Sequence, residues 1–217
     1  MILALETATN ICSVSFQNNE GEILEKRLER RGSHSEYLFL FIRELMQEHN
    51  FQISDLQTVL ISNGPGSYTG LRIAASAAKG FLFGLNVNVF AANTLAGFAE
   101  GVPKKSKTGS IHAVINARRS HLYHQQFIYD GNLTASSEAQ ILDLKEIEDK
   151  IKTGDILIGT GIERLDERPR ANVTEFGLET ITASSLITLF NREPESGFFT
   201  KTTAEELESN YISSSQV

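Results

Sequence analysis

The stretch Asn63-Gly64-Pro65-Gly66-Ser67-Tyr68-Thr69-Gly70-Leu71-Arg72 decides the fold class of this 217-residue chain. It follows the apolar run Thr58–Ser62, which is typical of a buried strand, and it opens a helical run that starts at Leu71. Its three glycines and one proline predict a sharp turn whose backbone can approach another surface closely. A strand, a tight loop and a helix in this order predict an α/β fold.

A glycine loop at the start of a helix is also a common way to bind a phosphate group. This loop lacks the Gly-Lys-Ser/Thr ending of a P-loop, and it lacks the Gly-x-Gly-x-x-Gly spacing of a dinucleotide-binding fold. The loop is therefore distinctive, but it carries no nucleotide signature.

The pattern of elements around the loop occurs twice along the chain. Each half is predicted to have three strands followed by alternating helices and strands. In the first half the predicted strands are Ile2–Glu6, Ile11–Gln17, Glu22–Glu29, Thr58–Ser62 and Asn86–Phe90, and the predicted helices are Ser33–His49, opened by a capping box of Ser33 and Glu36, Leu71–Leu85, and one capped by Asn93 or Thr94. In the second half the strands are Ile111–Asn116, His121–Tyr129, a third short strand and Asp155–Gly159, and the helices lie near Leu144–Ile151, Ala183–Asn191 and Thr203–Glu208.

This repetition predicts a duplicated α/β unit with two subdomains. The segment Gly101–Gly109, which contains glycine, proline and lysine, is a natural joint between them. The expected subdomains are residues 1–103, which carry the most apolar helices, and residues 104–217, whose last helix is a candidate to pack back on the first subdomain.

Composition places the chain among ordinary soluble globular proteins, with 41% hydrophobic and 22% charged residues. Its formal net charge of −7 makes it a poor candidate for binding nucleic acid alone, because contacts with phosphates dominate such affinity. Cys12 is the only cysteine, so no internal disulfide can form, and its apolar surroundings predict a small buried side chain. No apolar run is long enough for a signal or membrane segment, so we expect a cytoplasmic protein.

Two of the predicted helices carry more apolar surface than one sheet can cover. The first has apolar side chains over roughly 200° of its circumference, about twice the width that a surface helix needs. The second presents small residues on several faces, which lets another helix approach closely. Two explanations are open: other parts of this chain cover these faces, or a partner with a helical apolar surface does, and we favour the partner. The candidate interface residues are Tyr37, Leu38, Phe41, Leu45, Ala74, Ala75, Ala78 and Phe81.

Several segments together resemble one protein family. They are Leu3-Ala4-Leu5-Glu6-Thr7-Ala8-Thr9, Cys12-Ser13-Val14, His34 at the start of the first helix, and the string that begins at Gly64. Over its first half the chain resembles the TsaB (YeaZ) family, and the string is specific to this family and its close relatives. We refer to that string as the signature loop; its residues are Gly64, Pro65, Gly66, Ser67, Tyr68, Thr69, Gly70, Leu71 and Arg72.

The resemblance implies the duplicated fold shared by actin, sugar kinases and heat-shock chaperone ATPases, which is similar to ribonuclease H. It also implies a role in making threonylcarbamoyladenosine next to the anticodon of tRNAs that read codons starting with A. In that pathway a TsaD subunit transfers the threonylcarbamoyl group. A TsaB protein is its non-catalytic partner and binds it through the first two helices. A TsaE ATPase joins the pair. The resemblance further implies a homodimer when the chain is alone, contact with tRNA through the complex, and no cofactor of its own. Any nucleotide would lie at an interface shared with TsaD and TsaE.

The chain departs from the family pattern at three places. Glu6 stands where an Asp is usual at the end of the first strand, and Asn116-Ala117-Arg118-Arg119 replaces an Asp-Ala-Arg. The tail Asn210-Tyr211-Ile212-Ser213 lacks the usual Pro before the Tyr and the usual Arg after the hydrophobic residue.

The sequence offers no catalytic, metal-binding or cofactor-binding set of its own. TsaD-like metal binding uses two histidines one helical turn apart, and the predicted helix Thr94–Glu100 contains none. The turn Glu6-Thr7-Ala8-Thr9 has no glycine to wrap a phosphate, and both of its threonines are expected to form hydrogen bonds within the turn. The histidines are expected at the surface or at helix caps, with His121 and His124 on opposite faces of one strand; the others are His34, His49 and His112.

Two enzymatic alternatives stay open. One is a small-molecule kinase or ATPase of the same fold with a degenerate phosphate loop, which tight ATP binding by the isolated chain would favour. The other is a metallopeptidase, suggested by an old association of the family with glycoproteases, although no metal-ligand spacing in the sequence supports it.

Overall fold

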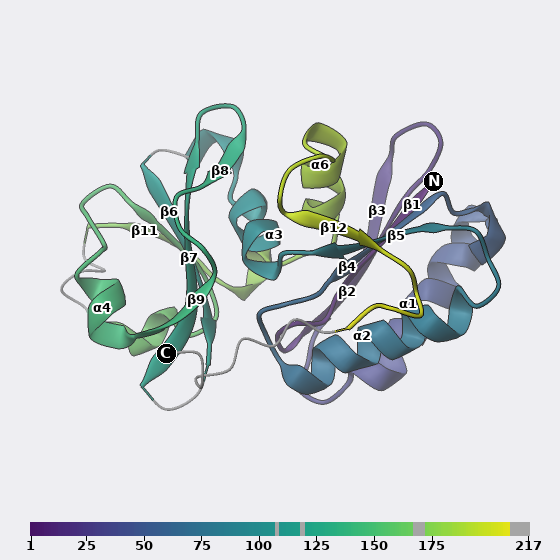
Figure 1. Ribbon diagram of the computed structural model, residues 1–217, viewed down its shortest axis with the longest axis horizontal. Helices are drawn as coiled ribbons and strands as arrows, with labels where there is room; N and C mark the ends of the chain where they lie inside the picture. The colour runs from purple at the N-terminus through teal and green to yellow at the C-terminus, as the bar shows by residue number, and fades with distance from the viewer. Residues whose placement is uncertain (107–108, 118–119, 167–171, 209–217) are drawn as a thin grey trace.

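The computed structural model describes residues 1–106, 109–117, 120–166 and 172–208 of the chain. Two β-sheets stand side by side, each with helices on its faces, and helix α3 lies between them (Figure 1). The first half of the chain builds one sheet and the second half builds the other, except that the last described strand returns to the first sheet.

The first sheet has six strands in the order β12-β5-β4-β1-β2-β3. They are β1 (Ile2–Glu6), β2 (Ile11–Gln17), β3 (Ile23–Glu29), β4 (Thr58–Ser62), β5 (Asn88–Ala92) and β12 (Phe199–Thr202). Strand β1 pairs antiparallel with β2 and parallel with β4, and β4 pairs parallel with β5. Helices cover both faces of β1 and β4, which is why these strands are almost continuously apolar and buried.

The second sheet repeats this arrangement with the order β11-β10-β6-β7-β8, and β9 also pairs with β7. Its strands are β6 (Ser110–Asn116), β7 (His121–Tyr129), β8 (Leu133–Ala135), β9 (Gln140–Asp143), β10 (Ile156–Gly159) and β11 (Thr174–Phe176). Strand β6 is antiparallel to β7 and parallel to β10, just as β1 is to β2 and β4. The repeated order and direction confirm the duplicated α/β fold.

The helices form layers around the two sheets. They are α1 (His34–His49), α2 (Tyr68–Phe81), α3 (Thr94–Gly101), α4 (Leu144–Glu148) and α6 (Ser184–Arg192), and the short 3-10 turns are Ile53–Asp55, Lys104–Ser106, Ile162–Arg164 and Leu178–Thr180. Helices α1 and α2 lie together on one face of the first sheet, and α6 lies on its other face (Figure 1). Helix α3 packs against α6 and against the second sheet, whose far face carries α4.

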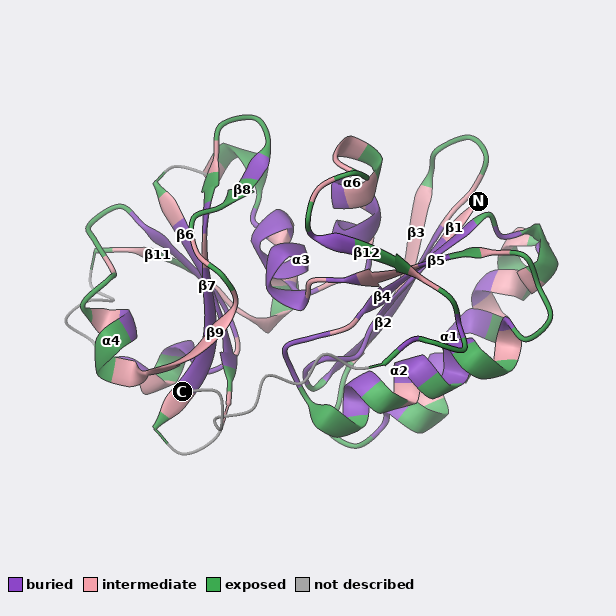
Figure 2. Ribbon diagram, in the orientation of Figure 1, coloured by how far each residue is buried: buried purple, intermediate pink, exposed green. Residues whose placement is uncertain are grey.

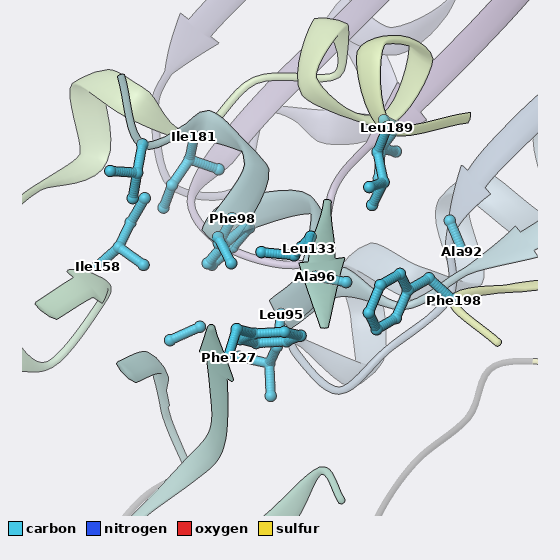
Figure 3. Close-up of a cluster of buried hydrophobic side chains, with 14 of the residues drawn as sticks. Ala92, Leu95, Ala96, Phe98, Phe127, Leu133, Ile158, Ile181, Leu189 and Phe198 are labelled. Carbon is cyan, nitrogen blue, oxygen red and sulfur yellow. The ribbon is translucent and has the colours of Figure 1, made fainter. Parts of the chain in front are cut away.

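One hydrophobic core joins the two subdomains. Every residue of α3 from Thr94 to Glu100 is buried, because strands of the second sheet and α6 pack around this helix (Figure 2). Figure 3 shows residues of α3 among side chains from both sheets and α6; the labelled ones are Leu95, Ala96, Phe98, Phe127, Leu133, Ile158, Ile181, Ala92, Leu189 and Phe198. A separate cluster fills the space between the first sheet and helices α1 and α2.

Polar contacts add to this shared core. Arg192 of α6 binds the buried carboxylate of Glu100 on α3 through two N–O contacts of 2.8 and 2.9 Å. Arg27 of β3 donates to the carbonyl oxygens of Leu178 and Ile181, at 2.5 and 3.0 Å, in the segment that returns from the second sheet. Bidentate and charge-assisted hydrogen bonds of this kind fix orientation as well as position. The two subdomains are therefore held in one arrangement.

The last part of the described chain belongs with the first sheet. Helix α6 packs against β1, β2 and β3, and β12 pairs antiparallel with β5. Strand β5 would otherwise be an open edge of the sheet, and β12 satisfies its backbone groups. The range 104–217 that the sequence assigns to a second subdomain thus contains elements of both.

Two local predictions are wrong. The hydroxyl of Ser33 donates to the carbonyl of Arg30 at 2.8 Å and does not cap α1, so the expected capping box does not form. Residues 203–208 form a turn and an extended segment in place of a helix, because Ala204 and Leu207 pack into the cluster between the first sheet and the α1–α2 layer. Packing against an existing surface here decides the local conformation.

The signature loop packs directly on the turn between β1 and β2. The amide of Ser67 donates to the carbonyl of Ala8 at 2.7 Å, and the hydroxyl of Thr7 donates to the carbonyl of Gly70 at 2.9 Å. A Cβ atom on Gly70 would lie 1.9 Å from the Thr7 carbonyl oxygen, and one on Gly66 would lie 2.6 Å from atoms of Ala8. The glycines are required by this close approach of two backbone segments.

Two glycines of α2 give a matched test of this packing. Gly70→Ala is expected to destabilise the chain by about 2 kcal/mol or more, because the added methyl group overlaps the Thr7 carbonyl. Gly80→Ala, where nothing lies within 4 Å of the added atom, is expected to stabilise it by about 1 kcal/mol through helix propensity alone. Urea unfolding of both variants measures the difference, and equal effects would contradict the role of the loop contact.

Candidate functional site

A cleft of about 1060 Å³ opens between the two subdomains. It lies at the carboxyl ends of the parallel strands β1, β4, β6 and β10, the place where α/β folds bind ligands. Four residues of the signature loop line it, namely Gly66, Ser67, Tyr68 and Thr69. The remaining lining residues are Ala8, Thr9, Asn10, Arg31, Ile115, Asn116, Ala117, Tyr123, Gly159, Thr160, Gly161, Ile162, Glu163, Arg164, Glu175, Gly177 and Leu178.

The carboxyl group of Glu6 is folded away from this cleft. Glu6 is 1% exposed, and its Oε1 accepts the backbone amide of Ala8 at 2.7 Å. Burial raises the pKa of Glu6 to about 7, and hydrogen bonds from Ser62 and Ala8 oppose this shift. A carboxyl group at this strand end could serve as a cation ligand only if it were ionised and exposed to the cleft. Glu6 instead holds the turn between β1 and β2 together.

Contacts within the protein occupy the groups of that turn. The hydroxyl of Thr9 accepts the amide of Ile11 at 3.1 Å, and the Thr9 carbonyl is 2.9 Å from Nε2 of His34. The expected turn hydrogen bond of Thr9 is therefore confirmed. Thr7 differs from the expectation, because its hydroxyl reaches across to the carbonyl of Gly70 and bonds outside the turn. The amide of Ala8, bonded to Glu6, and the amide of Ile11, bonded to Thr9, are therefore not free to bind a phosphate.

Residues that the second subdomain contributes to the cleft are also hydrogen-bonded to one another. The hydroxyl of Thr160 accepts the amide of Asn116 at 3.2 Å, and Nη1 of Arg164 donates to Oδ1 of Asn116 at 2.7 Å. Arg164 also donates to the carbonyl of His121 at 3.2 Å. Asn116 is thus tied to its neighbours across the ends of β6 and β10. Asn116 belongs to the segment Asn116-Ala117-Arg118-Arg119, which differs from the family pattern. Arg118 and Arg119 of that segment lie outside the described residues.

Burial divides the eight interface residues that the sequence suggests. Six of them lie in the core of this chain, which corrects the expectation that they face a partner: Leu38, Phe41, Leu45, Ala74, Ala75 and Ala78. They pack in the cluster that fills the space under α1 and α2. Tyr37 and Phe81 are half-buried at its margin. The first sheet therefore covers most of the apolar surface that we assigned to a partner from the sequence.

Other aromatic side chains are exposed on the same helical layer. Phe39 on α1 is 51% exposed, Tyr68 at the start of α2 is 44% exposed, and Phe83 just after α2 is 78% exposed, with Leu85 beside it. Sequence reasoning missed Phe39, Phe83 and Leu85 because a wide apolar surface does not reveal which part of it meets the sheet of the same chain. The available signal was spacing, since Phe39 falls in the same helical row as Ser35 and Arg43.

Three histidines are buried, which corrects the prediction of surface or capping roles. Nδ1 of His112 is 3.0 Å from Nε2 of His124, and Nε2 of His112 is 3.2 Å from Oδ2 of Asp155. Burial lowers the pKa of His124 to about 3 and also lowers the pKa of His112, so both rings are neutral. His34 is buried against Thr9. His112 and His124 come together because β6 and β7 pair and both side chains lie on the α4 face of the sheet.

Cys12 is fully buried, as its setting in the sequence predicts. Burial, with a smaller effect of Glu6, raises the pKa of its thiol to about 12, so the thiolate does not form at neutral pH. Within the described residues no three His, Cys, Asp or Glu side chains gather in a way that could hold a metal ion. None of the described helices is long and apolar enough to cross a membrane.

Glu6→Gln tests whether the carboxyl group is buried. A folded-state pKa of about 7, above the ordinary 4.5, means that Glu6 contributes stability below pH 4.5 that is lost as the pH rises through 7. Glutamine cannot ionise and keeps an acceptor for Ala8, so the variant should gain on the order of 1–3 kcal/mol relative to wild type between pH 5 and pH 8. Urea unfolding at both pH values measures this. The exposed Glu195→Gln serves as control and should show no such gain; an equal pH dependence in all three proteins would refute burial of the charge.

Comparison with known proteins agrees with this geometry. The family model described as TsaD, tRNA N6-adenosine threonylcarbamoyltransferase, matches residues 26–180, which is more than half of the chain. The tRNA threonylcarbamoyladenosine biosynthesis protein TsaB of Buchnera aphidicola subsp. Baizongia pistaciae is 31% identical over 170 residues, covering 75% of this chain and 76% of that protein. TsaB of Buchnera aphidicola subsp. Acyrthosiphon pisum is 28% identical over 70% of this chain and 69% of that protein.

A solved structure shows the same fold over nearly the whole length. YeaZ from Pseudomonas aeruginosa superposes with a TM-score of 0.81 at 24% sequence identity, covering 97% of this chain and 99% of that one. Three observations agree on one family: the duplicated sheets, the packing of the signature loop on the β1–β2 turn, and the sequence identity with these relatives. The chain therefore belongs to the TsaB (YeaZ) family, and its TsaB relatives are named as tRNA threonylcarbamoyladenosine biosynthesis proteins.

Proposed function

We propose that this chain is the non-catalytic, activating subunit of the complex that transfers threonylcarbamoyl to the adenosine next to the anticodon in tRNAs reading codons that start with A. It pairs with a TsaD-type subunit through the outward side of α1 and α2, and the pair recruits a TsaE-type ATPase. The observation that carries this proposal is the set of exposed aromatic side chains on that layer. Involvement in tRNA threonylcarbamoyladenosine biosynthesis is what the TsaB relatives are named for.

We call this outward side the partner face; its residues are Phe39, Ser76, Gly80, Phe83 and Leu85, and all five are exposed. No described element of the chain covers the outward sides of α1 and α2 (Figure 2). Exposed aromatic anchors around a flat, small-residue centre are typical of protein interfaces, because aromatic side chains supply much of the binding energy. A partner helix of apolar surface fits this face.

Gly80 adds a second argument for an interface. It lies inside α2, where glycine costs about 1 kcal/mol relative to alanine. No atom of the described chain lies near the position of its missing side chain, so internal packing does not explain the glycine. A close approach by the backbone of another protein would explain it.

The cleft supports the non-catalytic part of the proposal. A kinase or ATPase of this fold would need free backbone amides and an ionised carboxylate beside the phosphates. Here Glu6 is buried and bonded to Ala8, and the loop amide of Ser67 is bonded to the Ala8 carbonyl. Catalysis by domain closure would also need subdomains that move, whereas α3 and the Arg192–Glu100 pair join them.

We propose three further interactions: a homodimer through the partner face, contact of the complex with tRNA, and a nucleotide at an interface between subunits. When the chain is alone, two copies can bury their partner faces against each other and form a homodimer, which TsaD would then compete with. The complex works in the cytoplasm, where its tRNA substrate is, and it contacts tRNA as an assembly. Any nucleotide binds at an interface shared with TsaD and TsaE, because the chain's own cleft lacks a free phosphate loop.

Phe83→Glu tests the partner face. The side chain is 78% exposed, so the variant should keep the stability of the wild type, while affinity for TsaD should fall at least about a hundredfold because a charge replaces an aromatic anchor. Size-exclusion chromatography and calorimetry with purified TsaD measure assembly, and threonylcarbamoylation of tRNA by TsaD and TsaE should fall in parallel. Glutamate at Phe41 or Ala78 is unsuitable, because both residues are buried and the variants would unfold.

Ile128→Glu is the matched control. Ile128 is 49% exposed on β7 of the second subdomain, away from α1 and α2, so this charge should leave both assembly and modification unchanged. Normal assembly of the Phe83 variant would show that TsaD binds elsewhere. Modification of tRNA by TsaD and TsaE without this chain would overturn the activating role.

A further inference from the structure

Four of the described arginines lie at the mouth of the cleft. Arg31 and Arg164 line it, Arg30 precedes Arg31 in the same turn, and Arg72 stacks on Tyr68, another lining residue, with 4.1 Å between the guanidinium carbon and the ring centre. These residues come from three separate segments that the fold brings to one place. The side chains of Arg30 and Arg31 have no hydrogen-bond or ion-pair partner among the described residues.

The exposed lysines lie elsewhere. Lys104 and Lys105 belong to the turn before β6, and Lys150 and Lys152 precede β10. The amide of Ser110 binds Asp155, which places these two lysine segments together at the amino ends of β6 and β10, the end of the second sheet away from the cleft. Arginine, with a planar fork of donors, suits phosphate groups and ring faces better than lysine does. The cleft mouth is therefore the part of this acidic protein best suited to a phosphate-bearing ligand.

The form of the cleft favours a polynucleotide strand over a free nucleotide triphosphate. The groups that would hold a triphosphate and its metal ion are occupied, since Glu6 bonds to Ala8 and Ala8 bonds to Ser67. The rim instead presents guanidinium groups that can contact backbone phosphates, and the Tyr68 ring, 44% exposed, lies beside them where a base can stack. Glu163 also lines the cleft, and a carboxylate can accept a hydrogen bond from the amino group of a base edge.

We propose that the cleft mouth binds a single-stranded segment of the tRNA, with Arg30 and Arg31 on its backbone phosphates and the Arg72–Tyr68 pair against a base. This proposal rests on the proposed function, because a chain of net charge −7 gains enough affinity for RNA only within the assembled complex. It assigns to the second face of the signature loop a role separate from the partner face.

The test compares two pairs of sequence-adjacent basic residues, one at the cleft mouth and one far from it. Both are measured in the complete complex with TsaD and TsaE. The double variant Arg30→Ala/Arg31→Ala should weaken tRNA binding on the order of tenfold and lower the slope of log K against log salt by about 2. The matched double variant Lys104→Ala/Lys105→Ala removes the same charge at the far end and should change binding less than about twofold. Fluorescence anisotropy of labelled tRNA over a salt series measures both.

Controls separate this proposal from the proposed function. Size-exclusion chromatography should show normal assembly of both double variants with TsaD and TsaE, so a loss of tRNA binding would not reflect a broken complex. Equal tRNA affinity of the two double variants would overturn the RNA site while leaving the proposed subunit role intact. Tight binding of ATP to the isolated chain, lost in the arginine variant, would overturn it in favour of a free-nucleotide site.

Discussion

The contact between the signature loop and the β1–β2 turn is the constraint on which the rest of the structure depends. Gly70 lies so close to the Thr7 carbonyl that no side chain fits between them, and Ser67 bonds to Ala8 on the same surface. This contact fixes where α2 begins and therefore which side of α2 faces the sheet. It also takes up the backbone polar groups of Ala8, whose amide bonds to Glu6 and whose carbonyl bonds to Ser67.

The same contact separates two surfaces with different chemistry. On one side, α2 continues beside α1 and leaves aromatic and small residues facing outward, which suits a helical partner. On the other side, the loop forms one wall of the cleft between the subdomains, where arginines and a tyrosine gather. Because α3 is buried between the sheets and Arg192 binds Glu100, these surfaces keep a fixed relation to each other. The proposed role of this chain as a subunit that positions others does not require a cleft that opens and closes.

The order of elements predicted from local sequence patterns is largely confirmed, whereas predictions that depend on contacts between distant segments are largely wrong. The duplicated order of strands and helices follows from hydrophobic patterns and turn residues, and the structure confirms it. The candidate interface was largely wrong, because Leu38, Leu45 and Ala78 lie on two helices with wide apolar surfaces, and periodicity alone does not say which part of such a surface meets the sheet. His112 and His124 were expected at the surface or at helix caps, yet strand pairing buries them and brings nitrogen atoms of their rings, twelve positions apart in sequence, to 3.0 Å.

The fold class, the signature loop, the burial of Cys12 and the membership of a family could all be predicted from the sequence, because these depend on residue types and short spacings. Only the tertiary structure decided which apolar residues are core and which face outward, since that depends on how α1 and α2 are rotated on the sheet. It also decided that Glu6 is buried and that its pKa is about 7, because desolvation depends on the atoms that surround the carboxyl group. Chain segments distant in sequence supply those surroundings, and they meet only when the protein folds.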